Sequence, residues 1–313
     1  MLDLGERKQT NLGRLANPFV GRGIELHHVE TCVDEGRRPI TIVGPGGAGK
    51  TRLLQEVGHR LLPRFSGPDD GGVWFIGLNE ARTLTDIVLS TATVLGVSVA
   101  KTQSMLDTLG RAIAGRKRVL LLFDNFEQLV EHGPDTLNHW LETAPEASMV
   151  ISSRERLLLP GEQLISIGSL GLPDQTCASV DEFLDSEAGK LLIDRVRSVR
   201  SGYNPDSSEA TSLTNLVWRL DGMPLALELA GARFATLNPS QLLERLERRF
   251  EILSRRTRLP HRHDSLKTCI DWSWEMLSPV EQSVLAQCYV FSGGFDIDAA
   301  EAILEKGEGA STL

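Results

Sequence analysis

A glycine-rich octapeptide, Gly44-Pro45-Gly46-Gly47-Ala48-Gly49-Lys50-Thr51, constrains the fold of this chain more than any other feature. It satisfies the pattern G-x-x-x-x-G-K-[ST], which average residue frequencies would produce by accident in only about 1% of chains of this length. The apolar run 40–43 precedes it, and the helix-length segment 51–62 follows it. A strand, a glycine-rich loop and a helix in this order predict a loop whose backbone N–H groups and helix N-terminus bind phosphate groups.

Each residue type in this loop has an expected role. Glycines let the backbone approach the phosphates, Lys50 neutralises the β- and γ-phosphate charge, and Thr51 offers its hydroxyl to Mg²⁺. The alternative is an ordinary glycine-rich turn before a helix. The expected nucleotide contacts of the loop and the first turn of its helix come from Gly44, Gly46, Gly47, Ala48, Gly49, Lys50, Thr51 and Arg52.

A second motif is the apolar run 119–123, which ends at Asp124. A buried strand of this kind delivers one carboxylate to the edge of the sheet, so Asp124 is expected to bind Mg²⁺ together with Thr51. The next residue, Asn125, stands where many ATPases carry an acid that polarises the attacking water. An amide accepts no proton at neutral pH, so hydrolysis through Asn125 should be slow or absent. Glu127 is the nearest substitute base; alternatively, its carboxylate only helps a helix to begin.

The same alternation of short apolar runs and helix-length segments continues from Phe19 to about Gly168. The expected strands are 40–43, 73–76, 119–123, 149–151 and 164–167. The expected helices are 51–62, 85–95, 105–114 and 134–143. This order predicts an α/β P-loop NTPase domain of three layers, with a parallel five-stranded sheet covered by helices on both faces.

Beyond Pro173 the strand-like runs stop, and apolar residues recur at helical spacing. The expected organisation is a lead-in (1–17), a P-loop nucleotide-binding domain (18–170), an all-α helical domain (171–255) and a last domain (256–313). A basic stretch from Arg245 to Lys267 carries eight basic and three acidic side chains.

Composition limits the classes of protein to which this chain can belong. With 33 Lys and Arg against 42 Asp and Glu, the net charge is −9, so no broad positive field is available to a nucleic-acid backbone. The apolar runs are far shorter than the roughly 18–20 residues of a membrane span, and the N-terminus does not resemble a secretory signal. The four cysteines form no C-x-x-C pair. A cytoplasmic protein with reduced thiols and no membrane partner is therefore expected.

Several further motifs follow one another in an order known from one class of ATPase. They are PFVGR (18–22), LLFDNFE (121–127), SSRE (152–155), LLPGE (158–162), LDGMPLALELA (220–230) and LKTCIDWSW (266–274). With the glycine-rich loop, they resemble the STAND class of signal-transducing P-loop ATPases, which is NB-ARC-like and related to the nucleotide-binding domains of apoptotic and plant immune receptors. Within that class, the chain is most similar to ATPase modules of large bacterial transcriptional regulators.

The resemblance implies roles for residues outside the glycine-rich loop. Val20 and Arg22 would contact the adenine, and Pro224 would close the helical domain over the base. Arg154 would read the terminal phosphate, although an arginine after a strand can also form a surface ion pair. The segment from about Pro260 resembles a winged-helix domain that is too short to be complete, as expected for a module of a longer chain.

These features favour a nucleotide-dependent switch that binds ATP or ADP with Mg²⁺, hydrolyses ATP slowly and self-associates in the ATP-bound state. Its partners would include the sensor and effector domains of a larger regulator, and direct binding of nucleic acid is not expected. One alternative is a DNA-binding regulator that uses the basic stretch and the winged helix. Another is a pseudo-ATPase that holds nucleotide as a structural cofactor, which Asn125 permits.

Overall fold

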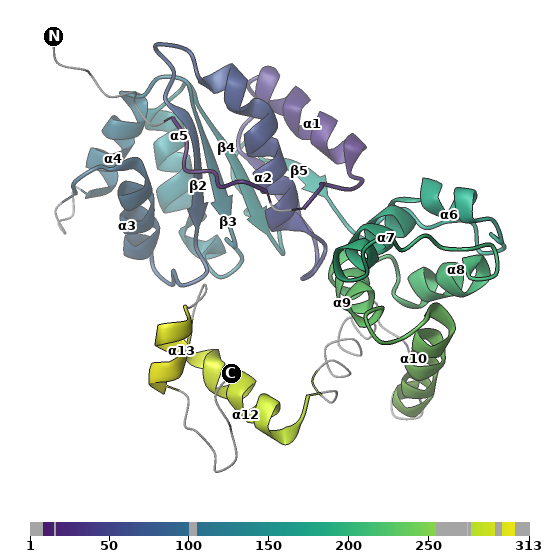
Figure 1. Cartoon of the computed structure of the whole chain (residues 1–313). Coiled ribbons are helices and arrows are strands. Elements are labelled where there is room, and N and C mark those ends of the chain that lie inside the picture. The colour runs from purple at the N-terminus through teal and green to yellow at the C-terminus, as the bar shows by residue number, and fades with distance from the viewer. Residues whose placement is uncertain are drawn as a thin grey trace, which may run out of the picture. The chain divides into compact units, whose positions relative to one another are not determined.

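The structure of this chain is a computed structural model that describes residues 9–15, 17–99, 105–254, 274, 277–291 and 296–303 (Figure 1). It divides into two compact units, Met1–Gly168 and Ser169–Leu313. Among the described residues, no helix combines the length and the apolar character that a membrane crossing requires.

The first unit is built on a five-stranded sheet in which all paired strands are parallel. Its strands are β1 (Ile40–Val43), β2 (Gly72–Gly77), β3 (Val119–Asp124), β4 (Ala147–Ser153) and β5 (Gln163–Ser166). They lie in the order β2-β3-β4-β1-β5, and the predicted three-layer fold is confirmed. Because β4 lies between β1 and β3, the residues that follow β4 are placed between the glycine-rich loop and Asp124.

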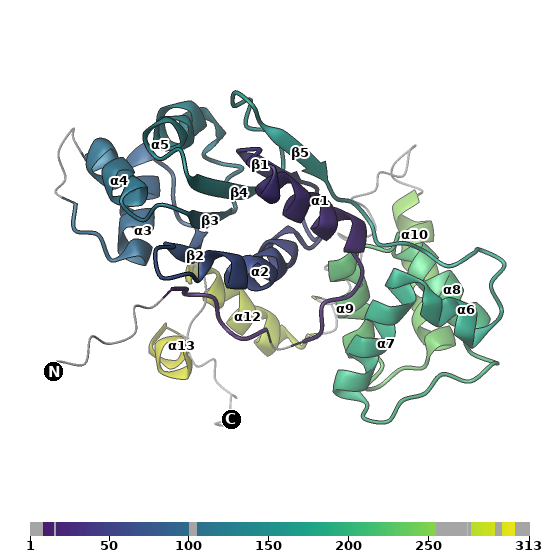
Figure 2. The ribbon, with the colours of Figure 1, turned by 90° about the horizontal axis from the view of Figure 1, so that it is seen from above.

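Helices cover both faces of this sheet, with α3, α4 and α5 on one face and α1 and α2 on the other (Figures 1 and 2). Side chains of a strand alternate between the two faces, so Phe123 and Ile151 join one apolar cluster with residues of α3 to α5. On the opposite face, α2 packs against β2, β3 and β4. The helical segments of this unit are α1 (Gly23–Asp34), α2 (Lys50–Leu61), η1 (Leu62–Phe65), α3 (Leu84–Leu95), α4 (Met105–Ala114), η2 (Val130–His132), η3 (Pro134–Asn138) and α5 (His139–Thr143).

The helix predictions for this unit need two amendments. α1 was not among the predicted helices, and it buries Leu26, Val29 and Cys32. The segment 134–143, expected as one helix, begins as the π-helical turn η3 and continues as α5.

The described part of the predicted lead-in is attached to the edge strand β2, which the sequence did not indicate. Thr10 forms a parallel bridge with Val73. The side chain of Asn11 accepts a hydrogen bond from the N–H of Phe75 and donates one to its carbonyl oxygen, each at 2.7 Å. An edge strand leaves N–H and C=O groups unpaired, and here a single side-chain amide satisfies both groups of one residue.

The second unit is helical over its described residues, as predicted. Its segments are α6 (Val180–Asp185), α7 (Glu187–Val199), α8 (Ala210–Arg219), α9 (Pro224–Arg233), α10 (Pro239–Ser254), α12 (Pro279–Gln287), η4 (Cys288–Val290) and α13 (Ile297–Ile303). α7 packs against α9, and α8 packs against α10. Ser278 begins α12 with a capping box. Residues 255–273, which hold most of the basic stretch, lie outside the described residues, and the winged-helix domain stays a prediction.

Candidate nucleotide-binding site

The glycine-rich loop joins the end of β1 to the first turn of α2, as predicted. Gly47 and Gly49 have φ angles of 78° and 89°, in the left-handed region that glycine adopts without strain. A Cβ atom on Gly44 would lie 2.5 Å from the carbonyl oxygen of Ile167, so the loop passes too close to its neighbour for any other residue. No side chain caps α2, whose N-terminal N–H groups therefore suit an anion.

The Lys50 side chain is only 7% exposed and lies within this loop. Its ammonium donates to the carbonyl oxygens of Gly44 and Pro45, at 2.8 and 3.1 Å. Burial lowers the pKa of Lys50; the charge of Glu127 counteracts this effect, and that of Arg154 adds to it. A bound phosphate would restore the stability of the charged ammonium, because an opposite charge nearby favours the ionised form.

Thr51 and Asp124, the predicted metal ligands, lie in direct contact although 73 residues separate them. The Thr51 hydroxyl donates to both carboxylate oxygens of Asp124, at 3.0 and 2.9 Å. Ser152, at the end of β4, donates to Oδ1 of Asp124 at 2.5 Å. Burial raises the pKa of Asp124, and the hydrogen bonds from Ser152 and Thr51 oppose that rise.

This pair fits Mg²⁺ bound together with a nucleotide. Mg²⁺ takes oxygen ligands and usually has one or two protein carboxylates, completed by phosphate oxygens and water. The described residues contain no cluster of three or more His, Cys, Asp or Glu side chains that could hold a metal ion without such help.

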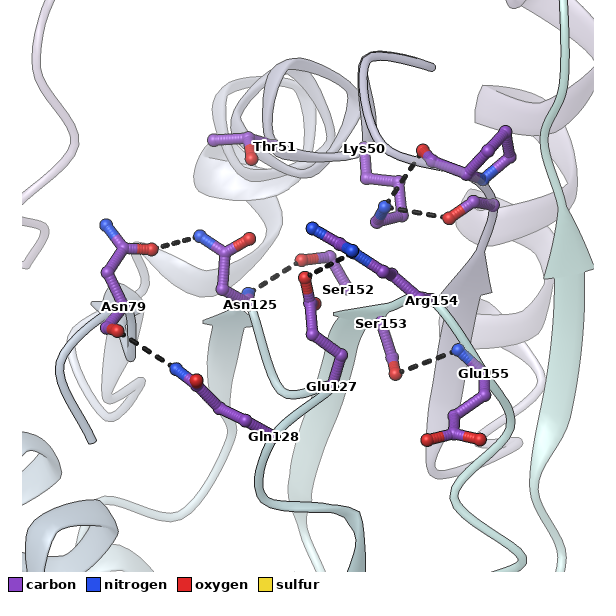
Figure 3. A network of polar contacts seen from close by, with 12 residues as sticks. Lys50, Thr51, Asn79, Asn125, Glu127, Gln128, Ser152, Ser153, Arg154 and Glu155 are labelled. Atoms are coloured by element: carbon purple, nitrogen blue, oxygen red, sulfur yellow. Dashed lines mark hydrogen bonds and ion pairs between the residues drawn. The ribbon is translucent and has the colours of Figure 1, made fainter. Parts of the chain in front are cut away.

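Arg154 follows β4, and its guanidinium lies beside the glycine-rich loop (Figure 3). Its Nη2 atom is 4.0 Å from the position that a Cβ atom on Gly46 would take. Its side chain is 66% exposed and forms an ion pair with Glu127, with 3.0 Å between Nε and Oε1. The second carboxylate oxygen of Glu127, Oε2, is buried and has no hydrogen-bond partner. Glu127 itself lies in a turn before η2.

Further polar side chains complete this edge of the sheet. Asn79, which follows β2, accepts a hydrogen bond at Oδ1 from Nδ2 of Asn125. Gln128 donates to the carbonyl oxygen of Asn79 at 2.9 Å. Asn125 has a left-handed φ of 63°, and its N–H donates to the Ser152 hydroxyl at 3.0 Å. The only signal in the sequence for Asn79 is that it lies just after the end of an apolar strand. Ser152 belongs to the SSRE motif (152–155), but the motif did not indicate its contact with Asp124.

The two other predicted arginines of the site hold backbone segments in this structure. Arg22 is buried, and its guanidinium donates to the carbonyl oxygens of Ala48, at 3.3 Å, and Gly168. Arg52 donates to the carbonyl oxygen of Asn17. Their contacts with a nucleotide stay predictions.

The remaining two predicted contacts lie on different units. Val20 is half-buried in the segment before α1, and Pro224 is the first residue of α9 in the second unit. Their contacts with the base also stay predictions.

Comparison of the sequence with known proteins finds one matching family model and several relatives. A family model described as an AAA domain matches residues 33–152. The chain is 32% identical over 309 residues to the uncharacterized protein Rv0894 of Mycobacterium tuberculosis, with 97% of this chain and 74% of the relative aligned. It is 29% identical over 267 residues to "Putative HTH-type transcriptional regulator Rv0890c" of the same organism, covering 85% of this chain and 28% of that protein.

Among solved structures, one similar protein is a Signal Transduction ATPase with Numerous Domains (STAND) protein with a tetratricopeptide repeat sensor, PH0952 from Pyrococcus horikoshii. The alignment has a TM-score of 0.49 and 15% identity, and it covers 92% of this chain and 37% of the other. By its identity to Rv0894 over nearly its whole length, this chain belongs to the same family as that protein; the AAA-domain match and the glycine-rich loop identify a P-loop ATPase domain in it, and other relatives are named as HTH-type regulators.

Proposed function

We propose that this chain is the nucleotide-binding module of a regulatory switch that binds ATP or ADP with Mg²⁺ and hydrolyses ATP slowly. The observation that carries the proposal is the convergence of three groups at one edge of the sheet: the Lys50 ammonium inside the loop, the Thr51–Asp124 pair, and the Arg154 guanidinium beside Gly46. A triphosphate with its metal ion requires a cation, oxygen ligands and a second positive charge in this arrangement.

Binding would exchange contacts that the side chains already make. Lys50 would replace its two loop carbonyls with phosphate oxygens, and Arg154 would leave Glu127 for the terminal phosphate. Thr51 and Asp124 would hold Mg²⁺, whose charge would stabilise the negative charge that develops during phosphoryl transfer. Once Arg154 had left, the Glu127 carboxylate would be available as a general base, whereas Asn125 cannot take a proton. We therefore expect slow hydrolysis to ADP and phosphate.

The switch requires that ADP and ATP stabilise different conformations of the whole module. ADP would favour a closed monomer, and ATP an open form that self-associates. Moving an equilibrium from 1:99 to 99:1 needs about 5.5 kcal/mol of differential binding. Hydrogen bonds to charged groups contribute about 1.5–3 kcal/mol each, so γ-phosphate contacts from Lys50 and Arg154 would together supply about 3–6 kcal/mol. We place this module in the cytoplasm, within a larger transcriptional regulator whose other domains sense the signal and produce the output.

Titration with a fluorescent ATP analogue tests the site directly. Lys50→Ala removes a charge-assisted contact with phosphate and is expected to weaken binding by about 10- to 100-fold. Lys190→Ala is the matched control, because it removes the same charge from an exposed position in α7 of the second unit. Unchanged affinity in Lys50→Ala, or equal losses in both variants, would contradict the assignment.

A further inference from the structure

The side-chain amide of Asn125 is held in one orientation next to Asp124. Its Nδ2 group donates to Oδ1 of Asn79 and to Oδ2 of Asp124, the latter at 3.2 Å. Turning the amide over would place its oxygen against the carboxylate oxygen of Asp124, which only accepts, so this contact decides which end is nitrogen, and the Asn79 amide then presents its oxygen to that nitrogen. Both N–H groups of Asn125 are thereby used, and no described residue donates to its Oδ1 atom.

The free acceptor faces the other polar groups of the site. Figure 3 shows the Asn125 nitrogen turned toward Asn79 and the oxygen on the side of Glu127 and Arg154. There, Oε2 of Glu127 is a second acceptor, which is buried and without a hydrogen-bond partner. A water molecule carries two O–H donors and is the natural partner for two acceptors without donors of their own.

We propose that Asn125 orients the water that attacks the γ-phosphate of ATP, and that Asn79 is the positioning residue that fixes the Asn125 amide for this task. This inference rests on the proposed ATP hydrolysis. The water oxygen forms a bond to the γ-phosphorus, and the bond from that phosphorus to the bridging oxygen breaks, so ADP leaves with the electron pair. One water proton passes to Glu127 and then to solvent. The other, hydrogen-bonded to Asn125 Oδ1, stays on the phosphate product, because an amide accepts a hydrogen bond without taking the proton.

Asn79 suits this role because its backbone is fixed independently of its side chain. Gln128 and Arg82 both donate to its carbonyl oxygen, each at 2.9 Å. The preceding residue, Leu78, donates its N–H to the carbonyl oxygen of Asp124 at 3.0 Å. The Asn79 side chain is exposed, so its replacement removes the contact with Asn125 while the turn keeps its own hydrogen bonds.

Single-turnover hydrolysis of ATP by the full chain, measured with ATP affinity, tests the role of Asn79. Asn79→Ala is expected to lower the rate at saturating ATP by about tenfold or more, since a misplaced reacting group costs up to about a hundredfold, while ATP affinity stays within about twofold. Asn79→Asp keeps an acceptor for Asn125 Nδ2 and should retain a rate close to that of the wild type. Equal rates in Asn79→Ala and the wild type, or equal losses in the Ala and Asp variants, would overturn the proposal.

A double-mutant cycle separates positioning from a general structural effect. If Asn79 acts through Asn125, Asn125→Ala alone lowers the rate, and adding Asn79→Ala causes no further loss. If the rate losses of the two single variants multiplied in the double variant, Asn79 would act independently of Asn125, and its positioning role would be overturned. A wild-type protein that binds ATP without hydrolysing it would overturn the inference and leave nucleotide binding intact, whereas a wild type that binds no nucleotide would refute the proposed function itself.

Discussion

Ser152→Ala should weaken both the stability of the first unit and its use of Mg²⁺. The Ser152 hydroxyl is buried between two elements of the site. It donates to Oδ1 of Asp124 at 2.5 Å and accepts from the N–H of Asn125 at 3.0 Å. Alanine removes both interactions at once, and a buried carboxylate loses one of its hydrogen-bond donors.

The magnitude follows from these two contacts. A hydrogen bond to a charged group contributes about 1.5–3 kcal/mol, and a buried N–H left without a partner costs about 1–3 kcal/mol. Asn125 is partly exposed, so solvent recovers part of the second cost, and we expect a net destabilisation of about 2–4 kcal/mol. The hydrogen bond from Ser152 is also the strongest influence that lowers the pKa of Asp124, so its removal raises that pKa further. Loss of a residue that orients a metal ligand typically weakens metal affinity by about 10- to 100-fold.

Two measurements check this prediction against a matched control. Hydrogen exchange of peptides from β3 and β4 reports the opening free energy of the first unit, and Mg²⁺ titration of ATP binding reports the metal site. Ser153→Ala is the control, because Ser153 is buried on the same strand but its hydroxyl accepts a hydrogen bond from the N–H of Glu155, at 3.2 Å, instead of donating one to Asp124. Equal behaviour of Ser152→Ala and Ser153→Ala in both measurements would show that Ser152 does not support Asp124.

Three further predictions concern the loop, the N-terminal segment and the thiols. Gly44→Ala should distort the loop and weaken ATP binding. Gly46→Ala should keep the unit folded, because its Cβ would have no atom closer than 4.0 Å. Thermal unfolding and ATP titration of the two variants test this difference. Asn11→Ala removes two hydrogen bonds to the β2 backbone and should lower the unfolding free energy by about 1–3 kcal/mol. Denaturant titration measures this, and an unchanged unfolding free energy would contradict the prediction. Burial raises the pKa of Cys32, so the folded chain holds this thiol proton more tightly than the unfolded chain. The contribution of Cys32 to the free energy of unfolding is therefore fully present below the ordinary thiol pKa and is lost as the pH rises from there through the raised pKa. Iodoacetamide should accordingly label Cys288 before Cys32, and the reverse order would refute this reading.

The parts of the fold and site that the sequence predicts are those with a local pattern. The five strands are runs of apolar residues because both faces of the sheet are covered, and such runs need no knowledge of the partner strand. The glycine-rich loop and its lysine form a contiguous motif. Asp124 could be assigned because it ends the most apolar run in the chain, and its contact with Thr51 follows from the closeness of strand ends in a parallel sheet.

The contacts that the sequence did not indicate are each made by a single side chain across a long separation in the chain. Asn11 contacts Phe75 from 64 residues away, Asn79 contacts Asn125 from 46, and Ser152 contacts Asp124 from 28. One polar residue has no periodicity, and polar residues are common after strands, so only the strand order brings these side chains together. Arg22 shows the converse, because its motif was visible but its contact with the loop carbonyl of Ala48 was not.

The nucleotide that accompanies the purified protein tests the central claim most directly. Wild-type protein purified without added nucleotide is denatured, and the supernatant is separated by ion exchange and quantified against the protein. The switch proposal predicts ADP or ATP at close to one molecule per chain, and much less with Lys50→Ala, because the buried ammonium in the loop is then missing. A wild-type protein that releases no nucleotide and binds no added ATP in the presence of Mg²⁺ would contradict the account.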